Sequence, residues 1–99
     1  LLLDTLAKGS ADSFVLRNHG VKAMLPGVFP LRAFSVNYML KDMRYAIELA
    51  AETDVDIKAA KTTNEVLQAA ANGPLADAYW PALLAVIDPT LEPQTPDGD

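Results

Sequence analysis

The chain has 99 residues, enough for one small domain, and a net charge of −5, which disfavours nucleic acid as a partner because the phosphate backbone is bound by clustered cations. It contains no Cys, and its single histidine, His19, cannot form a His-cluster metal site, so we expect neither a disulfide nor a metal. No apolar run approaches the roughly 20 residues of a membrane span, and the signal-peptide pattern is missing, so we expect no membrane partner and a cytoplasmic location.

The first two predicted helices are short. Residues 1–8 have the pattern of a helix end, with Gly9 as its stop. A second helix is predicted after an N-cap at Ser10, or alternatively Ser13, and should end near His19 and Gly20. The chain opens on Leu1 with no initiator Met, and we interpret the opening leucines as part of a helix whose earlier turns belong to a longer protein.

The middle of the chain carries the strongest helical signal. Residues 20–33 should be irregular, since they are rich in Gly and Pro. Residues 35–53 place apolar side chains at three- and four-residue spacing, which predicts an amphipathic helix. A further helix is expected over residues 57–71, ended by Asn72 and the residues after it.

A fifth helix is predicted over residues 76–87, with Asp77 as its cap and Pro81 in its first turn. Residues 88–99 contain three Pro and four acids, and we predict a disordered acidic, Pro-rich tail after a domain of residues 1–87. Ala and Leu dominate the apolar residues, and Val and Ile form no alternating runs. The sequence therefore predicts an all-α fold, a compact helical bundle of about five helices.

Charge is distributed unevenly along the chain. Residues 1–44 hold six Lys/Arg and three acids, a net of +3, whereas residues 45–99 hold two and ten, a net of −8. An anion-facing surface is therefore expected in the first half, with ordinary surface variation as the open alternative.

One polar patch stands out by helical spacing. Asn37, Lys41 and Arg44 fall on one flank of the third predicted helix. An amide, an ammonium and a guanidinium in a row could hold a carboxylate, a ribose or a phosphate. The alternative is a solvated face with an Arg44–Glu48 pair.

Two aromatic features are weaker candidates. His19 is more often a helix cap or a surface residue than a catalyst in such a position. Trp80, beside Tyr79, could stack on a ligand, although a single Trp in a small domain more often lies in the core or at an oligomer interface.

The region around the polar patch resembles a known family. Phe34, then Lys41-Asp42, then the Ala-rich stretch 46–51 are similar to the C-terminal domains of 3-hydroxyisobutyrate dehydrogenase-like enzymes, also called β-hydroxyacid dehydrogenases. The flanking segments 6–13, 24–29 and 69–77 follow in the same order, so that the resemblance is collinear over about residues 1–87.

The resemblance implies the helical C-terminal domain of a 6-phosphogluconate dehydrogenase-like enzyme. The enzyme would be an oxidoreductase that uses NAD or NADP to transfer hydride between a small 3-hydroxy acid and its semialdehyde. Lys41 would contact the cofactor, and Phe34, Asp42 and Asn37 would belong to the substrate cleft.

The same resemblance places the dinucleotide-binding fold and the catalytic Lys in an N-terminal domain outside this chain. We therefore expect no catalytic residue here, no activity of the chain alone, and partners consisting of that domain, the hydroxy-acid substrate and further copies of the enzyme. The alternative function is a free-standing helical protein-interaction module without catalysis, in which the opening leucines and Trp80 would contact another chain.

Overall fold

The computed structural model describes residues 1–97. Its helical elements are α1 (Leu2–Leu6), the π-helix η1 (Leu16–Met24), α2 (Val36–Glu52), α3 (Lys58–Ala71), the 3₁₀-helix η2 (Trp80–Leu83) and α4 (Leu84–Ile87). Because η2 runs directly into α4, these residues form five helical segments, and their only β-type pairing consists of isolated bridges. The predicted all-α bundle of about five helices is confirmed.

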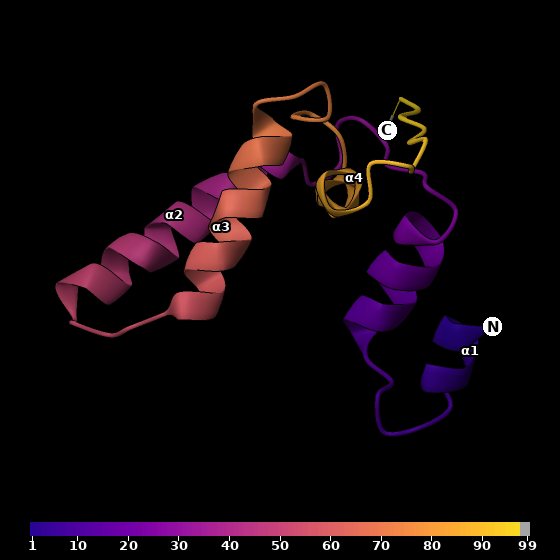
Figure 1. Ribbon diagram of the computed structural model, residues 1–99, viewed down its shortest axis with the longest axis horizontal. Helices are drawn as coiled ribbons and strands as arrows, with labels where there is room; N and C mark the ends of the chain where they lie inside the picture. Colours follow the sequence, from indigo (N-terminus) through magenta and orange to yellow (C-terminus); the bar gives the residue numbers. More distant parts are fainter. Residues whose placement is uncertain (98–99) are drawn as a thin grey trace.

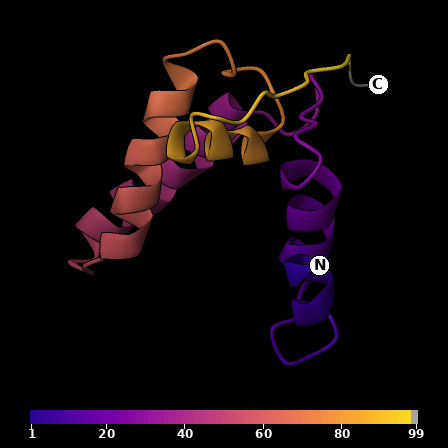
Figure 2. The ribbon, with the colours of Figure 1, turned by 45° about the vertical axis from the view of Figure 1, so that its right-hand side comes forward.

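The helices form a packed pair and an arm. In Figure 1, α2 and α3 lie side by side, and α4 lies between this pair and the arm made by α1 and η1. Figure 2 shows the same divergence from a second direction. The Cα radius of gyration is 14.6 Å, above the about 13 Å typical of 100 residues, because the arm extends away from the pair.

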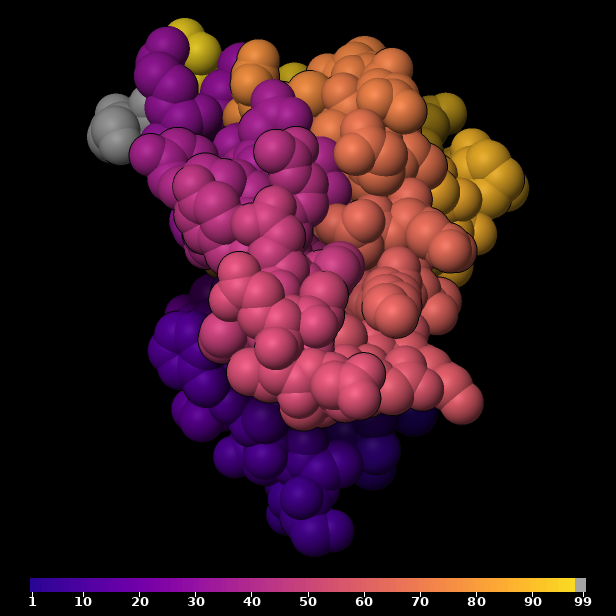
Figure 3. All heavy atoms as spheres, turned by 90° about the vertical axis from the view of Figure 1, so that its left-hand side faces the viewer, coloured from indigo at the N-terminus to yellow at the C-terminus, as the bar shows by residue number. Residues whose placement is uncertain are grey.

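The surface reflects this division. In Figure 3, α2 and α3 cover most of the visible face, and the arm projects below them. None of the helices in residues 1–97 combines the length and apolar character that crossing a bilayer demands.

The core lies where α2, α3 and η2 meet the loop before α2. Leu40 on α2 and Leu67 on α3 pack with Ala82 on η2, and the loop contributes Phe29 with none of its surface exposed. The complete buried cluster is Ala23, Phe29, Val36, Leu40, Leu67, Ala70, Ala78, Ala82. Four of these eight residues are alanines, and such small side chains let the backbones approach closely.

Both ends of α2 are defined by capping interactions. The Oγ atom of Ser35 accepts a hydrogen bond of 3.2 Å from the backbone amide of Tyr38, as an N-cap does. At the other end, Asp54 has φ +56°, and Val55 N donates to Ala50 O at 2.9 Å, which is the Schellman arrangement. The predicted helix over residues 35–53 is confirmed, and the next one, over 57–71, begins one residue late at Lys58.

The second helix is longer than predicted. The expected end near His19 and Gly20 is wrong, because η1 continues to Met24 and Leu25 N donates to Gly20 O at 2.8 Å. A Cβ atom on Gly20 would lie 3.6 Å from the Leu3 side chain, an ordinary van der Waals distance, so the contact between α1 and η1 does not require a glycine there. Residues 20–33 are therefore irregular only after Met24.

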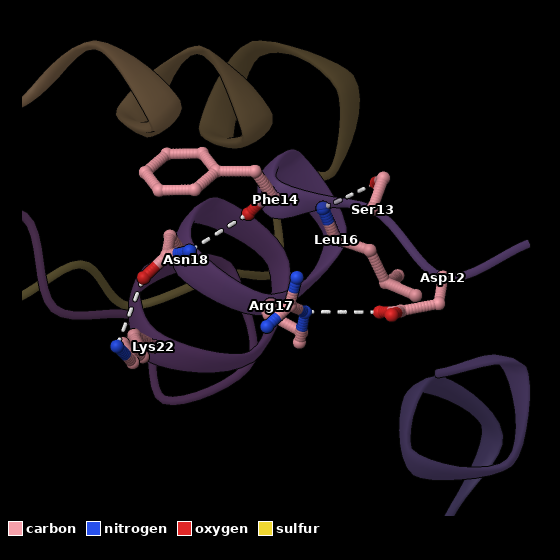
Figure 4. A network of polar contacts seen from close by, with 7 residues as sticks. All are labelled: Asp12, Ser13, Phe14, Leu16, Arg17, Asn18 and Lys22. Atoms are coloured by element: carbon pink, nitrogen blue, oxygen red, sulfur yellow. Dashed lines mark hydrogen bonds and ion pairs between the residues drawn. The ribbon is translucent and has the colours of Figure 1, made fainter. Parts of the chain in front are cut away.

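The start of η1 is held by side chains (Figure 4). The Oγ atom of Ser13 accepts from Leu16 N at 3.0 Å, and Arg17 Nε lies 2.9 Å from Asp12 Oδ1. The alternative N-cap at Ser13 is therefore confirmed, and the first choice, Ser10, is wrong because it lies in the turn before this network.

The last helical segment begins later than predicted. Helix η2 starts at Trp80 instead of Ala76, with Pro81 in its first turn as expected. The prediction that Asp77 caps this helix is wrong, because its Oδ1 atom accepts a hydrogen bond from Asn37 Nδ2 at 3.3 Å instead.

The predicted tail makes main-chain hydrogen bonds with the loop before α2, and its disorder in solution stays a prediction. Phe29 N donates to Gln94 O and Gln94 N donates to Gly27 O, both at 2.7 Å, and Leu91 packs against the core cluster. Main-chain hydrogen bonds do not depend on side-chain composition, so a Pro-rich acidic segment can still make them. The last two residues of the predicted tail lie outside the described residues, and the domain boundary at 87 stays a prediction.

Truncation of Leu67 should destabilise the fold strongly. Leu67 is fully buried, so Leu67→Ala should lower the free energy of unfolding by about 2–5 kcal/mol in urea titrations. Leu49→Ala is the matched control, because Leu49 is 61% exposed on α2 and its loss should cost less than about 1 kcal/mol. Equal losses for the two variants would contradict the packing described for α2 and α3.

Candidate functional site

The candidate site surrounds the first two turns of α2. The Lys41 ammonium lies 4.3 Å from the centre of the Tyr38 ring, a cation–π contact. The Tyr38 ring in turn lies 5.8 Å from the Phe34 ring at a tilt of 46°. The structure thus brings Phe34 and Lys41 into one row through Tyr38. Sequence reasoning did not place Tyr38 in the site, although its spacing of three residues from Lys41 and four from Phe34 was the signal that could have found it.

Asp42 lies beside this row. Its Oδ1 atom is 3.9 Å from Lys41 Nζ, at the limit of an ion pair, and the two side chains are 54% and 46% exposed. An exposed pair of this length contributes little energy. The Lys41 ammonium therefore lies against the Tyr38 ring and keeps hydrogen-bond donors for an anion.

The rest of the polar flank does not converge on Lys41. Asn37 is bound to Asp77 from the turn before η2, so its amide links α2 to that turn. Among the ion pairs of residues 1–97, none joins Arg44 to Glu48, which leaves the anticipated pair unformed.

The backbone amides at the start of α2, which have no partner within the helix, are hydrogen-bonded to other parts of the fold. Such amides commonly bind anions in proteins. Here the bonds join Val36 N to Ala78 O (2.9 Å), Asn37 N to Ala76 O (3.1 Å) and Tyr38 N to Ser35 Oγ (3.2 Å). An anion at this end of α2 must therefore be held by side chains.

A hollow of about 450 Å³ adjoins the row of aromatic side chains. Its lining residues are Leu31, Arg32, Ala33, Ser35, Tyr38 and Asp77. Tyr38 belongs both to this hollow and to the contact with Lys41. Across residues 1–97, the acidic and histidine side chains form no group of three that could hold a metal ion.

His19 lies in an aromatic cluster between the arm and η2. Its ring centroid is 4.8 Å from Trp80, 5.8 Å from Tyr79 and 5.9 Å from Phe14. The buried Nδ1 atom of His19 has no hydrogen-bond partner within the described chain. His19 is thus a packing residue instead of a helix cap, and Trp80 joins the arm to the helical pair.

Comparison with known families identifies the chain. The family model described as NAD-binding of NADP-dependent 3-hydroxyisobutyrate dehydrogenase matches residues 1–87. Because the match covers most of the chain, the chain belongs to this family. The match includes Lys41, Phe34, Asp42 and Asn37, and it supports NAD(P) and a dehydrogenase as the molecular context. Comparison with curated proteins finds no match.

Burial raises the pKa of Tyr79 above its ordinary value of 10.0. The folded state therefore holds this phenolic proton more tightly than the unfolded chain, so the contribution to stability is complete below pH 10 and is lost as the pH rises beyond it. In urea unfolding at about pH 8 and about pH 11, Tyr79→Phe should lose less stability on the alkaline side than the parent chain.

The control for this experiment is Tyr45→Phe, since Tyr45 is 61% exposed on α2. That variant should follow the parent chain at both pH values. If Tyr79→Phe shows the same alkaline loss as the parent, burial of this phenol is not the cause of the loss.

Proposed function

We propose that this domain closes the active-site cleft of an NAD(P)-dependent 3-hydroxyacid dehydrogenase and that Lys41 is its contact with the dinucleotide. The observation that carries the proposal is the ammonium of Lys41 held 4.3 Å over Tyr38 within a chain of this family. A phosphate group suits such a cation, and the amides that could otherwise bind it are occupied.

The neighbouring side chains fit the same role. The rings of Phe34 and Tyr38 provide an apolar wall that a planar ring can contact and that excludes water. Asp42 is half exposed beside Lys41 and can line the substrate part of the cleft, and Asn37 lies on the preceding turn of α2.

The reaction proposed is reversible conversion of a small 3-hydroxy acid into its semialdehyde. The dinucleotide supplies the hydride acceptor or donor. We place the Lys that exchanges the hydroxyl proton in another domain, so residues 1–97 hold, orient and shield, and the chain alone should be inactive.

The exposed apolar side chains favour other proteins or domains as partners. Tyr45 and Leu49 are each 61% exposed on α2, and Leu2 (71%) and Phe14 (67%) are exposed on the arm. Apolar surface of this kind commonly meets another domain or subunit. We propose a dinucleotide-binding domain and further copies of the enzyme as the partners, in the cytoplasm.

The coding sequence upstream of Leu1 tests the assignment directly. It should encode a β-strand followed by G-x-G-x-x-G and, further on, a Gly-rich helix that carries a Lys. A start codon close to Leu1, or an upstream region without a dinucleotide-binding pattern, would instead favour the alternative of a helical interaction module, which the exposed leucines of α1 also suit.

Removal of the Lys41 charge should weaken cofactor binding. In the full-length dehydrogenase, Lys41→Ala should raise the Kd of NADPH roughly 10–150-fold, the loss expected for one charge-assisted hydrogen bond. Lys61→Ala, which removes an exposed charge from α3, is the control and should leave that Kd unchanged. Equal Kd values for the parent enzyme and the Lys41 variant would refute the role given to Lys41.

A further inference from the structure

The Lys41 ammonium has two neighbours on α2, and they differ in how well they can direct it. The Tyr38 ring lies one turn earlier, with its centre 4.3 Å from Nζ. Asp42 is the adjacent residue, and its carboxylate reaches Nζ only at 3.9 Å, close to the upper limit of an ion pair. Residues three apart on a helix are neighbours on its surface, whereas adjacent residues do not face each other. The ring is therefore the neighbour better placed to direct the ammonium.

The Tyr38 ring is itself supported by the start of α2. Its backbone amide donates to Ser35 Oγ at 3.2 Å, and its ring centre lies 5.8 Å from that of Phe34. The carbonyl oxygen of Phe34 in turn accepts a hydrogen bond from Trp80 N at 2.7 Å. A tyrosine side chain also has fewer rotatable bonds than a lysine side chain, so the ring is the less mobile partner in the contact.

We propose that Tyr38 is a positioning residue for Lys41, because contact with its ring orders the ammonium before the dinucleotide binds. This inference rests on the function proposed above for Lys41. Ordering a flexible side chain during binding costs free energy, and a side chain that is already ordered avoids that cost. The attraction comes from the face of the aromatic ring, so the phenolic hydroxyl of Tyr38 is not needed for it.

A direct contact between the ring and a ligand is the alternative that the experiment must separate. Tyr38 helps to line the 450 Å³ hollow, where a bound molecule would touch the ring itself. A residue that acts through Lys41 loses its effect when the ammonium is removed, whereas a residue that touches the ligand keeps its effect. Variants of Tyr38 made with and without Lys41 therefore distinguish the two roles.

The first measurement follows the ε-CH₂ protons of Lys41 by NMR in the 99-residue chain. Protons above the face of an aromatic ring resonate upfield of their position in a flexible side chain. Tyr38→Leu should abolish this upfield shift, and Tyr38→Phe should retain it, because phenylalanine keeps the ring face. Leucine is a good helix former and Tyr38 is 57% exposed, so α2 should remain intact, which circular dichroism verifies.

The matched control is Tyr45→Leu. Tyr45 is also a tyrosine of α2, is 61% exposed and lies four residues after Lys41. Within residues 1–97 the cation–π contact of Lys41 is with Tyr38 and not with Tyr45. Tyr45→Leu should therefore leave the Lys41 protons at their upfield position.

The second measurement is the Kd of NADPH in the full-length dehydrogenase. Tyr38→Leu should raise this Kd roughly two- to five-fold, the scale of one exposed cation–π contact, and Tyr38→Phe should restore the parent value. In an enzyme that already carries Lys41→Ala, Tyr38→Leu should raise the Kd no further.

Several outcomes overturn the inference. An unmoved Lys41 signal in Tyr38→Leu, or an equal change in Tyr45→Leu, would show that the Tyr38 ring does not order the ammonium. An equal rise in Kd with and without Lys41 would show that the ring acts directly on the ligand. If Lys41→Ala raises the Kd and Tyr38→Leu does not, the inference fails and the role of Lys41 stands. If Lys41→Ala leaves the Kd unchanged, the proposed function fails and this inference fails with it.

Discussion

The main-chain pairing between residues 76–80 and the loop before α2 determines where the candidate site lies. Tyr79 N donates to Pro30 O at 2.8 Å, Trp80 N donates to Phe34 O at 2.7 Å, and Val36 N donates to the carbonyl oxygen of Ala78 at 2.9 Å. Ala78 is fully buried, and a buried amide or carbonyl group without a hydrogen-bond partner costs free energy. The fold therefore requires these hydrogen bonds. They fix the backbone of Phe34 and the first turn of α2, and thereby the direction in which the Tyr38 ring and the Lys41 ammonium point.

The same pairing changes how the site can attract an anion. A helix N-terminus with open amides carries a fixed partial positive charge, which binds phosphate without any side chain. In α2 the first backbone amides donate hydrogen bonds to carbonyl oxygens of residues 76–78 and to the Ser35 hydroxyl. Attraction at this end of α2 therefore depends on side-chain cations, of which Lys41 lies nearest the Tyr38 ring. In the function proposed above, such a contact can form as two domains close, without rearrangement of the α2 backbone.

Sequence reasoning succeeded where the determinants are local. Apolar spacing predicted α2 almost to the residue, and the same spacing predicted α3. It failed at Gly20, because a glycine favours a helix end but does not impose one, and η1 continues through it to Met24. The bond between Asn37 and Asp77 spans 40 residues, so no local pattern announces it. The main-chain hydrogen bonds between the tail and residues 27–31 are likewise not predictable from composition, because a Pro-rich acidic segment can still pair through its backbone.

The uneven charge along the sequence acquires a spatial meaning in the fold. The basic half, residues 1–44, supplies Lys41 beside the Tyr38 ring and Arg32 to the hollow that Tyr38 helps to line, and the acidic half places Asp97 3.5 Å from Arg32. Opposite charges that lie this close interact within the Debye length, where salt screens them least. Tyr38 both lines the hollow and contacts the Lys41 ammonium, so the cations of the basic half gather around one aromatic side chain at the start of α2.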